Sequence, residues 1–270
     1  FINESITELK TIVAPTEKMM EAEEDLIATF GRDTLSQIPK NLCREIMGLY
    51  QQFKDQKPSV VHAFHDRINV VAGIAAVLAG VPRIVLSTRS VSKHDTESVN
   101  PFARPLWYRE AYKILLQRPQ VQLYHVSKAV SKTYDDWLQL EKRQQYVLYN
   151  STDYDLMRES SSETEFLKEK KGIKINEDSL IVGGIMRFSS EKRPLSFIKT
   201  AEIVLRKIPN ANFIMLGDGP LMDQAARLIR RLNLNDKIHL IGRSHHIYHW
   251  LDNFDASILT SEFEGFPNVF

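Results

Sequence analysis

The stretch Ser179-Leu-Ile-Val-Gly-Gly-Ile-Met-Arg187-Phe-Ser-Ser-Glu-Lys192-Arg-Pro194 joins a short apolar run to two glycines, a basic loop and a proline. A continuous apolar run of this length is typical of a strand buried on both faces. Residues 195–208 follow with apolar side chains at helical spacing. A buried strand that leads directly into an amphipathic helix predicts a βαβ unit in a parallel sheet.

The same alternation extends to both sides of this stretch. Strands are predicted over 59–64, 83–88, 121–127, 144–149, 179–186, 212–216, 238–241 and 256–259, and helices over 68–78, 104–116, 129–140, 195–208 and 221–232. Residues 1–57 are expected to be mainly helical, over 19–30 and 42–53, with too few strands to open a lobe. We therefore expect an α/β protein with two Rossmann-like lobes, each a parallel sheet flanked by helices, and an incomplete N-terminal lobe.

Residues 158–178 separate the two halves of the pattern. They are mostly Ser, Glu, Lys and Asp, with few large apolar side chains, as in a linker or surface helix. The sequence therefore predicts one lobe over residues 1–155 and a second over 156–270.

Composition excludes several classes of protein. Among 270 residues, 35 Lys and Arg balance 34 Asp and Glu, so the net charge of +1 does not indicate a nucleic-acid partner. The single cysteine, Cys43, excludes an internal disulfide and a multi-cysteine zinc site, and it fits a reducing, cytoplasmic compartment. We expect Cys43 to be a buried small side chain on a helix. No uncharged apolar run reaches the roughly 18 residues that a spanning helix needs.

Ligands of open α/β sheets bind at the carboxyl ends of the strands, so the loops after the strands are the candidate site. Arg187 and Lys192 follow the first strand of the second lobe. They suit a diphosphate, although a solvated basic loop would have the same composition. Glu264 and Gly265 follow the fourth strand, where a carboxylate and backbone N–H groups suit a phosphorylated sugar.

Taken in order, four loops resemble the donor-binding half of the group 1 glycosyltransferases (family 4, GT-B fold). The family pattern Arg-Leu-x-x-Glu-Lys appears as Arg187-Phe-Ser-Ser-Glu191-Lys192, and Gly-x-Gly-Pro appears as Gly217-Asp-Gly219-Pro220. Gly242-Arg243 follows the third strand, and the family's E-x7-E motif starts at Glu264. In the first lobe, Pro58-Ser-Val-Val-His62-Ala and Tyr149-Asn150-Ser-Thr-Asp153 resemble further family segments, so the resemblance covers about residues 57–270.

The resemblance implies a role for each matched residue. Arg187 and Lys192 would neutralise the leaving nucleoside diphosphate, and Glu264 would contact the hydroxyls of the transferred sugar. The donor-binding residues that it implies are Gly184, Gly217, Gly219, Gly242, Arg243, Gly265, Phe266, Pro267 and Asn268. It also implies retention of the anomeric configuration, no bound metal and no cofactor.

The chain also departs from the family pattern. The second Glu of E-x7-E would fall two residues after Phe270, and the early glycine-rich loop is absent, so we expect a fragment truncated at both ends. His62-Ala-Phe-His65 places the second histidine one residue later than the His-x-His of some members. Because successive strand residues face opposite sides, His65 fits that role less well. His65 and Asp66 remain additional catalytic candidates.

The expected function is a retaining, metal-independent glycosyltransferase. It would move a hexose or hexosamine from a UDP- or GDP-sugar to a glycan or lipid-linked acceptor, in bacterial surface polysaccharide synthesis (lipopolysaccharide or capsule), at the inner face of the cytoplasmic membrane. One alternative is a nucleotide-sugar epimerase, which needs acid and base carboxylates in the first lobe, where Asp66 is the candidate. Another is a non-catalytic nucleotide-sugar-binding protein that has kept the fold.

Two further stretches have competing interpretations. His245, His246 and His249 lie close in sequence but lack the glutamate of a zincin motif, so we expect no metal site. Residues 104–118 are basic and aromatic, which fits either a helix on a membrane surface or a solvated helix packed over the sheet.

Overall fold

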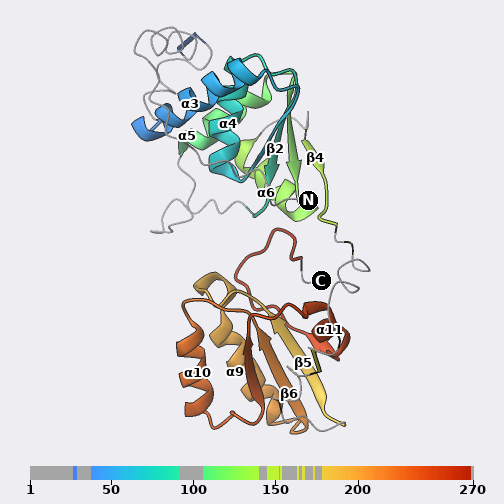
Figure 1. Cartoon of the computed structure of the whole chain (residues 1–270). Helices are drawn as coiled ribbons and strands as arrows, with labels where there is room; N and C mark the ends of the chain where they lie inside the picture. The colour runs from blue at the N-terminus through green and yellow to red at the C-terminus, as the bar shows by residue number, and fades with distance from the viewer. Residues whose placement is uncertain are drawn as a thin grey trace. The chain divides into compact units, whose positions relative to one another are not determined.

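The structure is a computed structural model that describes residues 27–28, 38–91, 106–139, 145–151, 153, 163, 166–167, 173 and 178–268. The chain folds into two compact units, Phe1–Asn150 and Ser151–Phe270 (Figure 1). Few residues around the predicted boundary at 155/156 are described, and the predicted helix over 19–30 lies almost entirely outside the described residues.

The first unit contains a four-stranded parallel sheet of order β1-β2-β3-β4. Its strands are β1 (Val61–Phe64), β2 (Ile84–Thr88), β3 (Val121–His125) and β4 (Gln145–Val147), and its helices are α3 (Lys40–Gln56), α4 (Asp66–Leu78), α5 (Leu106–Leu116) and α6 (Lys128–Leu138). Each predicted strand and helix from residue 42 to 149 has its counterpart here, with shifted ends.

The core of the first unit lies between the sheet and α4. Alternate residues of β1 are buried and exposed, and the buried ones, Val61 and Ala63, face the same core as Leu86 and Leu123 of the neighbouring strands. Helix α4 contacts β1 and β2 as well as α3 and α5 (Figure 1). Its apolar composition on all sides follows from this burial between layers.

The second unit has a parallel sheet of order β7-β6-β5-β8. Its strands are β5 (Leu180–Ile185), β6 (Ala211–Leu216), β7 (Ile238–Gly242) and β8 (Ala256–Ser257), joined by the 3-10 turn η1 (Ser190–Lys192) and the helices α9 (Pro194–Leu205), α10 (Met222–Arg231) and α11 (Ile247–Asp252). The predicted strand over 256–259 is shorter in the structure, and α11 and η1 were not predicted.

Both faces of the second sheet are covered, as the largely apolar and fully buried strand β6 requires. Phe213 and Met215 belong to a core with α9 and α10, whereas Ile214 and Leu216 belong to a core with Trp250 of α11. This alternation follows from the period of two along a strand. The α/β class with two parallel sheets flanked by helices is confirmed. None of the helices in the described part of the chain combines the length and apolar character needed to cross a bilayer.

Candidate functional site

A pocket of about 500 Å³ lies in the second unit, where β5, β6 and β7 end. The segment after β8, residues 259–268, supplies its remaining wall. The structure brings eight of the predicted site residues together in its lining: Arg187, Lys192, Gly217, Arg243, Glu264, Phe266, Pro267 and Asn268. The lining also includes Asp218, which we did not predict although it lies inside the Gly-x-Gly-Pro motif.

The pocket floor is formed by close approaches between the strand ends. Gly217 has φ of +121°, and a Cβ there would lie 1.9 Å from the carbonyl oxygen of Met186. Its N–H donates to the carbonyl of Gly242 at 2.7 Å, while the Met186 N–H donates to the carbonyl of Leu216 at 3.0 Å. A residue with a side chain cannot occupy position 217 without moving the backbone that leads to Arg187.

Lys192 and Glu264 form an ion pair in the pocket. Lys192 Nζ and Glu264 Oε1 are 2.5 Å apart, and the two side chains are 27% and 25% exposed. The Thr260 hydroxyl donates to the carbonyls of Lys192 and Arg193, each at 3.0 Å, and so fastens the segment before Glu264 to η1. The backbone therefore holds these two opposite charges beside each other.

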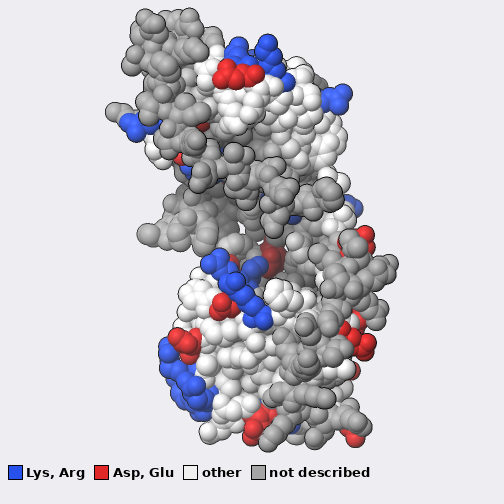
Figure 2. All heavy atoms as spheres, in the orientation of Figure 1, with Lys and Arg blue, Asp and Glu red and all other residues white. Residues whose placement is uncertain are grey.

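The other charged groups of the pocket are more exposed. Arg243 Nε lies 3.4 Å from Asp218 Oδ2, with the two side chains 84% and 48% exposed. Arg187 is exposed at the pocket wall. Figure 2 shows Lys and Arg side chains gathered at the upper end of the second unit, with acidic side chains beside them. The pocket thus offers guanidinium and ammonium donors for an anion and carboxylates for hydroxyl groups.

Glu191, the acidic residue of the first motif, has a local structural role. The Ser189 hydroxyl donates to Glu191 Oε1 at 2.6 Å, and this hydrogen bond lowers the pKa of the Glu191 carboxyl. The Glu191 carbonyl accepts from the Glu262 N–H at 2.8 Å. The motif therefore builds the turn that carries Lys192.

The remaining predicted glycines do not line the pocket. Gly184 is buried in β5, where a Cβ would lie 2.5 Å from the Phe197 ring, so the packing of α9 requires this glycine. Gly219 lies against the backbone of Phe188, and Gly242 ends β7 with φ of +80°. Gly265 follows Glu264 in the segment after β8. The structure gives Gly184, Gly219 and Gly242 a packing or turn role, and the ligand contacts expected of these three glycines and of Gly265 stay predictions.

The first unit places His65 and Asp66 at the carboxyl end of β1. His65 is exposed and has φ 67° and ψ 150°, a strained conformation for a residue with a side chain. Asp66 Oδ1 accepts from the hydroxyl of Tyr112 at 2.9 Å and from the hydroxyl of Tyr134. Both tyrosines are fully buried, and burial together with the charge of Asp66 raises the pKa of Tyr112 well above its ordinary value. Asp66 therefore fastens the start of α4 to α5 and α6.

A buried histidine that the sequence analysis did not select lies in the same unit. His125 Nδ1 is 2.8 Å from the Thr88 hydroxyl oxygen, and His125 Nε2 is 3.0 Å from Gln145 Oε1. Burial lowers the pKa of His125 below its ordinary value. The sequence around His125 does not indicate these two partners, because Thr88 and Gln145 lie on the neighbouring strands β2 and β4.

This histidine predicts an acid-sensitive fold. Between the lowered pKa and about 6.5, the unfolded chain binds more protons at His125 than the folded one, so stability falls as the pH drops below about 6.5. In that window, His125→Gln should reduce the slope of unfolding free energy against pH by up to about 1.4 kcal/mol per pH unit. Urea unfolding at several pH values measures it, with exposed His245→Gln as the control. An unchanged slope in His125→Gln would contradict the prediction.

The histidine group of the second unit packs on the fold. The His249 ring stacks on Phe166 with ring centres 5.3 Å apart, next to the buried Trp250. The described residues contain no group of three or more His, Cys, Asp or Glu side chains that could hold a metal ion. Cys43 lies on α3 and is half-buried, not fully buried as we expected.

The basic and aromatic stretch over 104–118 contains α5, and residues 104 and 105 of this stretch lie outside the described residues. Trp107 is 7% exposed and Tyr112 is fully buried. Arg109 donates to Gln139 Oε1 at 3.0 Å, and Lys113 lies 3.3 Å from Glu110. Because these aromatic rings point into the unit, they do not form an apolar face for a membrane, and the solvated helix is the better interpretation.

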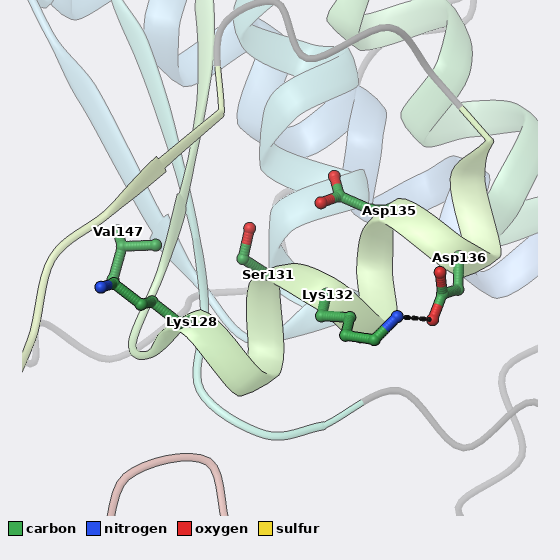
Figure 3. Close-up of a pocket in the computed structure, with 6 residues that line it drawn as sticks. All are labelled: Lys128, Ser131, Lys132, Asp135, Asp136 and Val147. Carbon is green, nitrogen blue, oxygen red and sulfur yellow. Dashed lines mark hydrogen bonds and ion pairs between the residues drawn. The ribbon is translucent and has the colours of Figure 1, made fainter.

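A second pocket, of about 440 Å³, lies in the first unit between α6 and β4 (Figure 3). Its lining residues are Lys128, Ser131, Lys132, Asp135, Asp136 and Val147. Lys132 and Asp136 pair with each other along the helix at 3.2 Å. This pocket contains none of the residues predicted from the sequence, and its two lysines are balanced by two aspartates, so it has no excess of positive charge for an anion.

Two family models and several known proteins are similar to this chain. Residues 165–270 match the family model described as glycosyl transferases group 1, and residues 11–126 match the model described as glycosyl transferase 4-like. The chain is 28% identical to the Vi polysaccharide biosynthesis protein VipC/TviE of Salmonella typhi over 239 residues, which are 87% of this chain and 40% of that protein.

One further relative and one solved structure also match most of this chain. UDP-Gal:alpha-D-GlcNAc-diphosphoundecaprenol alpha-1,3-galactosyltransferase of Escherichia coli is 24% identical over 229 residues, which are 83% of this chain and 57% of that protein. A crystal structure of Anabaena Alr3699/HepE in complex with UDP and glucose matches with a TM-score of 0.63 and 20% identity, over 83% of this chain and 58% of that chain. The chain thus spans 40% to 58% of the length of these relatives.

Proposed function

The chain belongs to the group 1 glycosyltransferases, and on this premise we propose that it transfers a sugar from a nucleotide-sugar donor to an acceptor glycan. The observation that carries the proposal is the pocket at the carboxyl edge of the second sheet. It places Arg187 and Lys192 within one lining with Glu264. Cationic side chains and a carboxylate in one pocket match the two parts of a nucleotide sugar, its diphosphate and its hydroxyl-bearing ring.

Arg187 and Lys192 would bind the donor diphosphate, and Arg243 would lie beside the nucleotide base. Cleavage of the bond between the anomeric carbon and the phosphate oxygen leaves negative charge on the nucleoside diphosphate. A guanidinium and an ammonium group held at that place stabilise this charge as it develops, without a metal ion. Glu264 would accept hydrogen bonds from the sugar hydroxyls, with the backbone N–H groups of residues 265–268 beside it.

The finer assignment is a retaining transfer of a hexose or hexosamine from a UDP- or GDP-sugar to a glycan or lipid-linked acceptor in bacterial surface polysaccharide synthesis. The names of the relatives support it: one is a polysaccharide biosynthesis protein, and one is a galactosyltransferase named for a diphosphoundecaprenol-linked sugar. The solved structure of Anabaena Alr3699/HepE is a complex with UDP and glucose. A lipid-linked acceptor would place the reaction at the cytoplasmic face of the membrane. His65, exposed and strained after β1, remains a further candidate for contact with the reacting sugar.

Product analysis tests the proposal. The chain is incubated with labelled UDP- and GDP-hexoses and hexosamines and with diphosphoundecaprenol-linked glycan, and the lipid and nucleotide fractions are separated. We expect label in the lipid fraction, with the anomeric configuration of the donor. An epimerised nucleotide sugar would instead indicate the isomerase, which the binding of Asp66 by two tyrosine hydroxyls disfavours. Failure to turn over any of these donors would contradict the proposal.

A further inference from the structure

The exposed side of two helices in the second unit is rich in basic side chains. Helices α9 and α10 contact each other and cover the same face of the sheet, with Phe197 and Leu228 in one core (Figure 1). On α10, Arg227, Arg230 and Arg231 stand three and four residues apart, so they share one side of the helix. The basic surface comprises six exposed cations on these helices and directly after α9: Lys199, Arg206, Lys207, Arg227, Arg230 and Arg231.

Most of this positive charge is not neutralised by neighbouring carboxylates. Among the described residues, only Arg206 of the six has an ion pair, with Glu202 at 2.7 Å. Asp223, in the first turn of α10, is the one other acidic residue in the sequence of these two helices. In Figure 2, Lys and Arg side chains gather along the side of the second unit where Figure 1 shows α10. Because the whole chain has a net charge of only +1, the basic surface is a local excess.

Exposed isoleucines lie among these cations. Ile203 stands four residues after Lys199, on the same side of α9, and it is 60% exposed, while Ile208 after the helix is 40% exposed. An anionic bilayer uses both kinds of side chain, because cations meet lipid phosphates and aliphatic groups enter the headgroup region. A nucleic acid would use the cations alone, since its bases stack on aromatic side chains and neither helix has an exposed one.

We propose that the basic surface binds a membrane surface that contains anionic phospholipids, with Ile203 and Ile208 in the headgroup region. This inference goes beyond the proposed function and concerns another part of the second unit, because none of the six cations lines the pocket of Lys192 and Glu264. Attraction to an anionic leaflet raises affinity by on the order of fivefold for each cation near it. A chain held in this way stays close to a lipid-linked acceptor.

Sedimentation of the 270-residue chain with lipid vesicles tests the proposal. We expect binding to vesicles of phosphatidylcholine mixed with phosphatidylglycerol, weakened by added salt, and no binding to vesicles of phosphatidylcholine alone. The triple variant Arg227→Gln, Arg230→Gln, Arg231→Gln should lower the partition coefficient by on the order of 100-fold. Ile203→Ser, which leaves the charge unchanged, should lower it by roughly tenfold.

The matched control is the triple variant Arg44→Gln, Lys57→Gln, Arg83→Gln. These three cations are exposed on the first unit, so this variant has the same net charge as the α10 variant. Its partition coefficient should stay close to the wild-type value, and thermal unfolding monitors the fold of each variant. Calorimetric titration with UDP should give the α10 variant the wild-type dissociation constant, because its arginines lie outside the pocket lining.

The outcomes separate this inference from the proposed function. Equal binding to the two kinds of vesicle, no binding by the folded wild-type chain, or an equal loss in the control variant would overturn the inference. Tighter binding of a DNA duplex than of anionic vesicles, lost in the α10 variant, would assign the surface to a nucleic acid and also overturn it. A chain that binds anionic vesicles but neither UDP nor a nucleotide sugar would contradict the proposed function and leave this inference in place.

Discussion

Replacement of Lys192 by alanine is expected to weaken binding of a nucleoside diphosphate by roughly 100-fold and to lower the transfer rate by about 10²- to 10³-fold. The substitution removes an ammonium group that is only 27% exposed, and it leaves the Glu264 carboxylate unpaired in the pocket. The ligand then meets a negative charge where it had met a positive one. Calorimetric titration and a single-turnover transfer assay measure the two effects.

Lys199→Ala is the control for this substitution. Lys199 lies on α9, is exposed and does not line the pocket, so the change in side chain and net charge is the same. Its affinity for the nucleoside diphosphate should equal that of the wild type. Equal loss of affinity in both variants would mean that general charge, and not the position of Lys192, attracts the ligand.

Replacement of Gly217 by alanine is expected to lower the free energy of unfolding by about 3 kcal/mol or more, because the added Cβ meets a backbone atom. That Cβ would lie 1.9 Å from the Met186 carbonyl oxygen, and φ of +121° is unfavourable for alanine. The backbone has to move, so the Arg187 loop is displaced and nucleotide binding is lost along with stability. Urea unfolding measures the stability.

Gly48→Ala is a matched control, since a Cβ at Gly48 in α3 would have no atom within 4 Å. Alanine is favoured over glycine inside a helix by about 1 kcal/mol, so this variant should be as stable as the wild type or slightly more stable. A Gly217→Ala variant as stable as the wild type would contradict the close approach that forms the pocket floor.

The elements that sequence alone predicts well are those whose pattern is local. The apolar run of β6 and the helical spacing after Pro194 determine a buried strand and its covering helix, because strand and helix periods differ. The loops at Arg187, Gly217 and Glu264 then meet at one edge, since parallel strands bring their carboxyl ends together. The pocket lining therefore follows from the order of the loops.

Contacts between residues far apart in sequence were not predictable in this way. The Lys192–Glu264 pair spans 72 residues, and the Tyr134–Asp66 bond spans 68. Their existence depends on how the elements pack, and the basic and aromatic composition of residues 104–118 did not indicate that Tyr112 is fully buried. Gly184 has a packing role that the sequence did not indicate, because a glycine required by the Phe197 ring and a glycine required by a ligand look the same in sequence. Helix α11 has six residues, too few for a periodic pattern.

A crystal structure of the chain grown with UDP tests the central claim most directly, because it locates the diphosphate. We predict density for the nucleotide in the second-unit pocket, with phosphate oxygens within hydrogen-bond distance of Arg187 and Lys192 and with the Lys192–Glu264 pair broken or lengthened from 2.5 Å. UDP bound elsewhere, or an unoccupied pocket with the pair intact at a saturating concentration, would contradict the account.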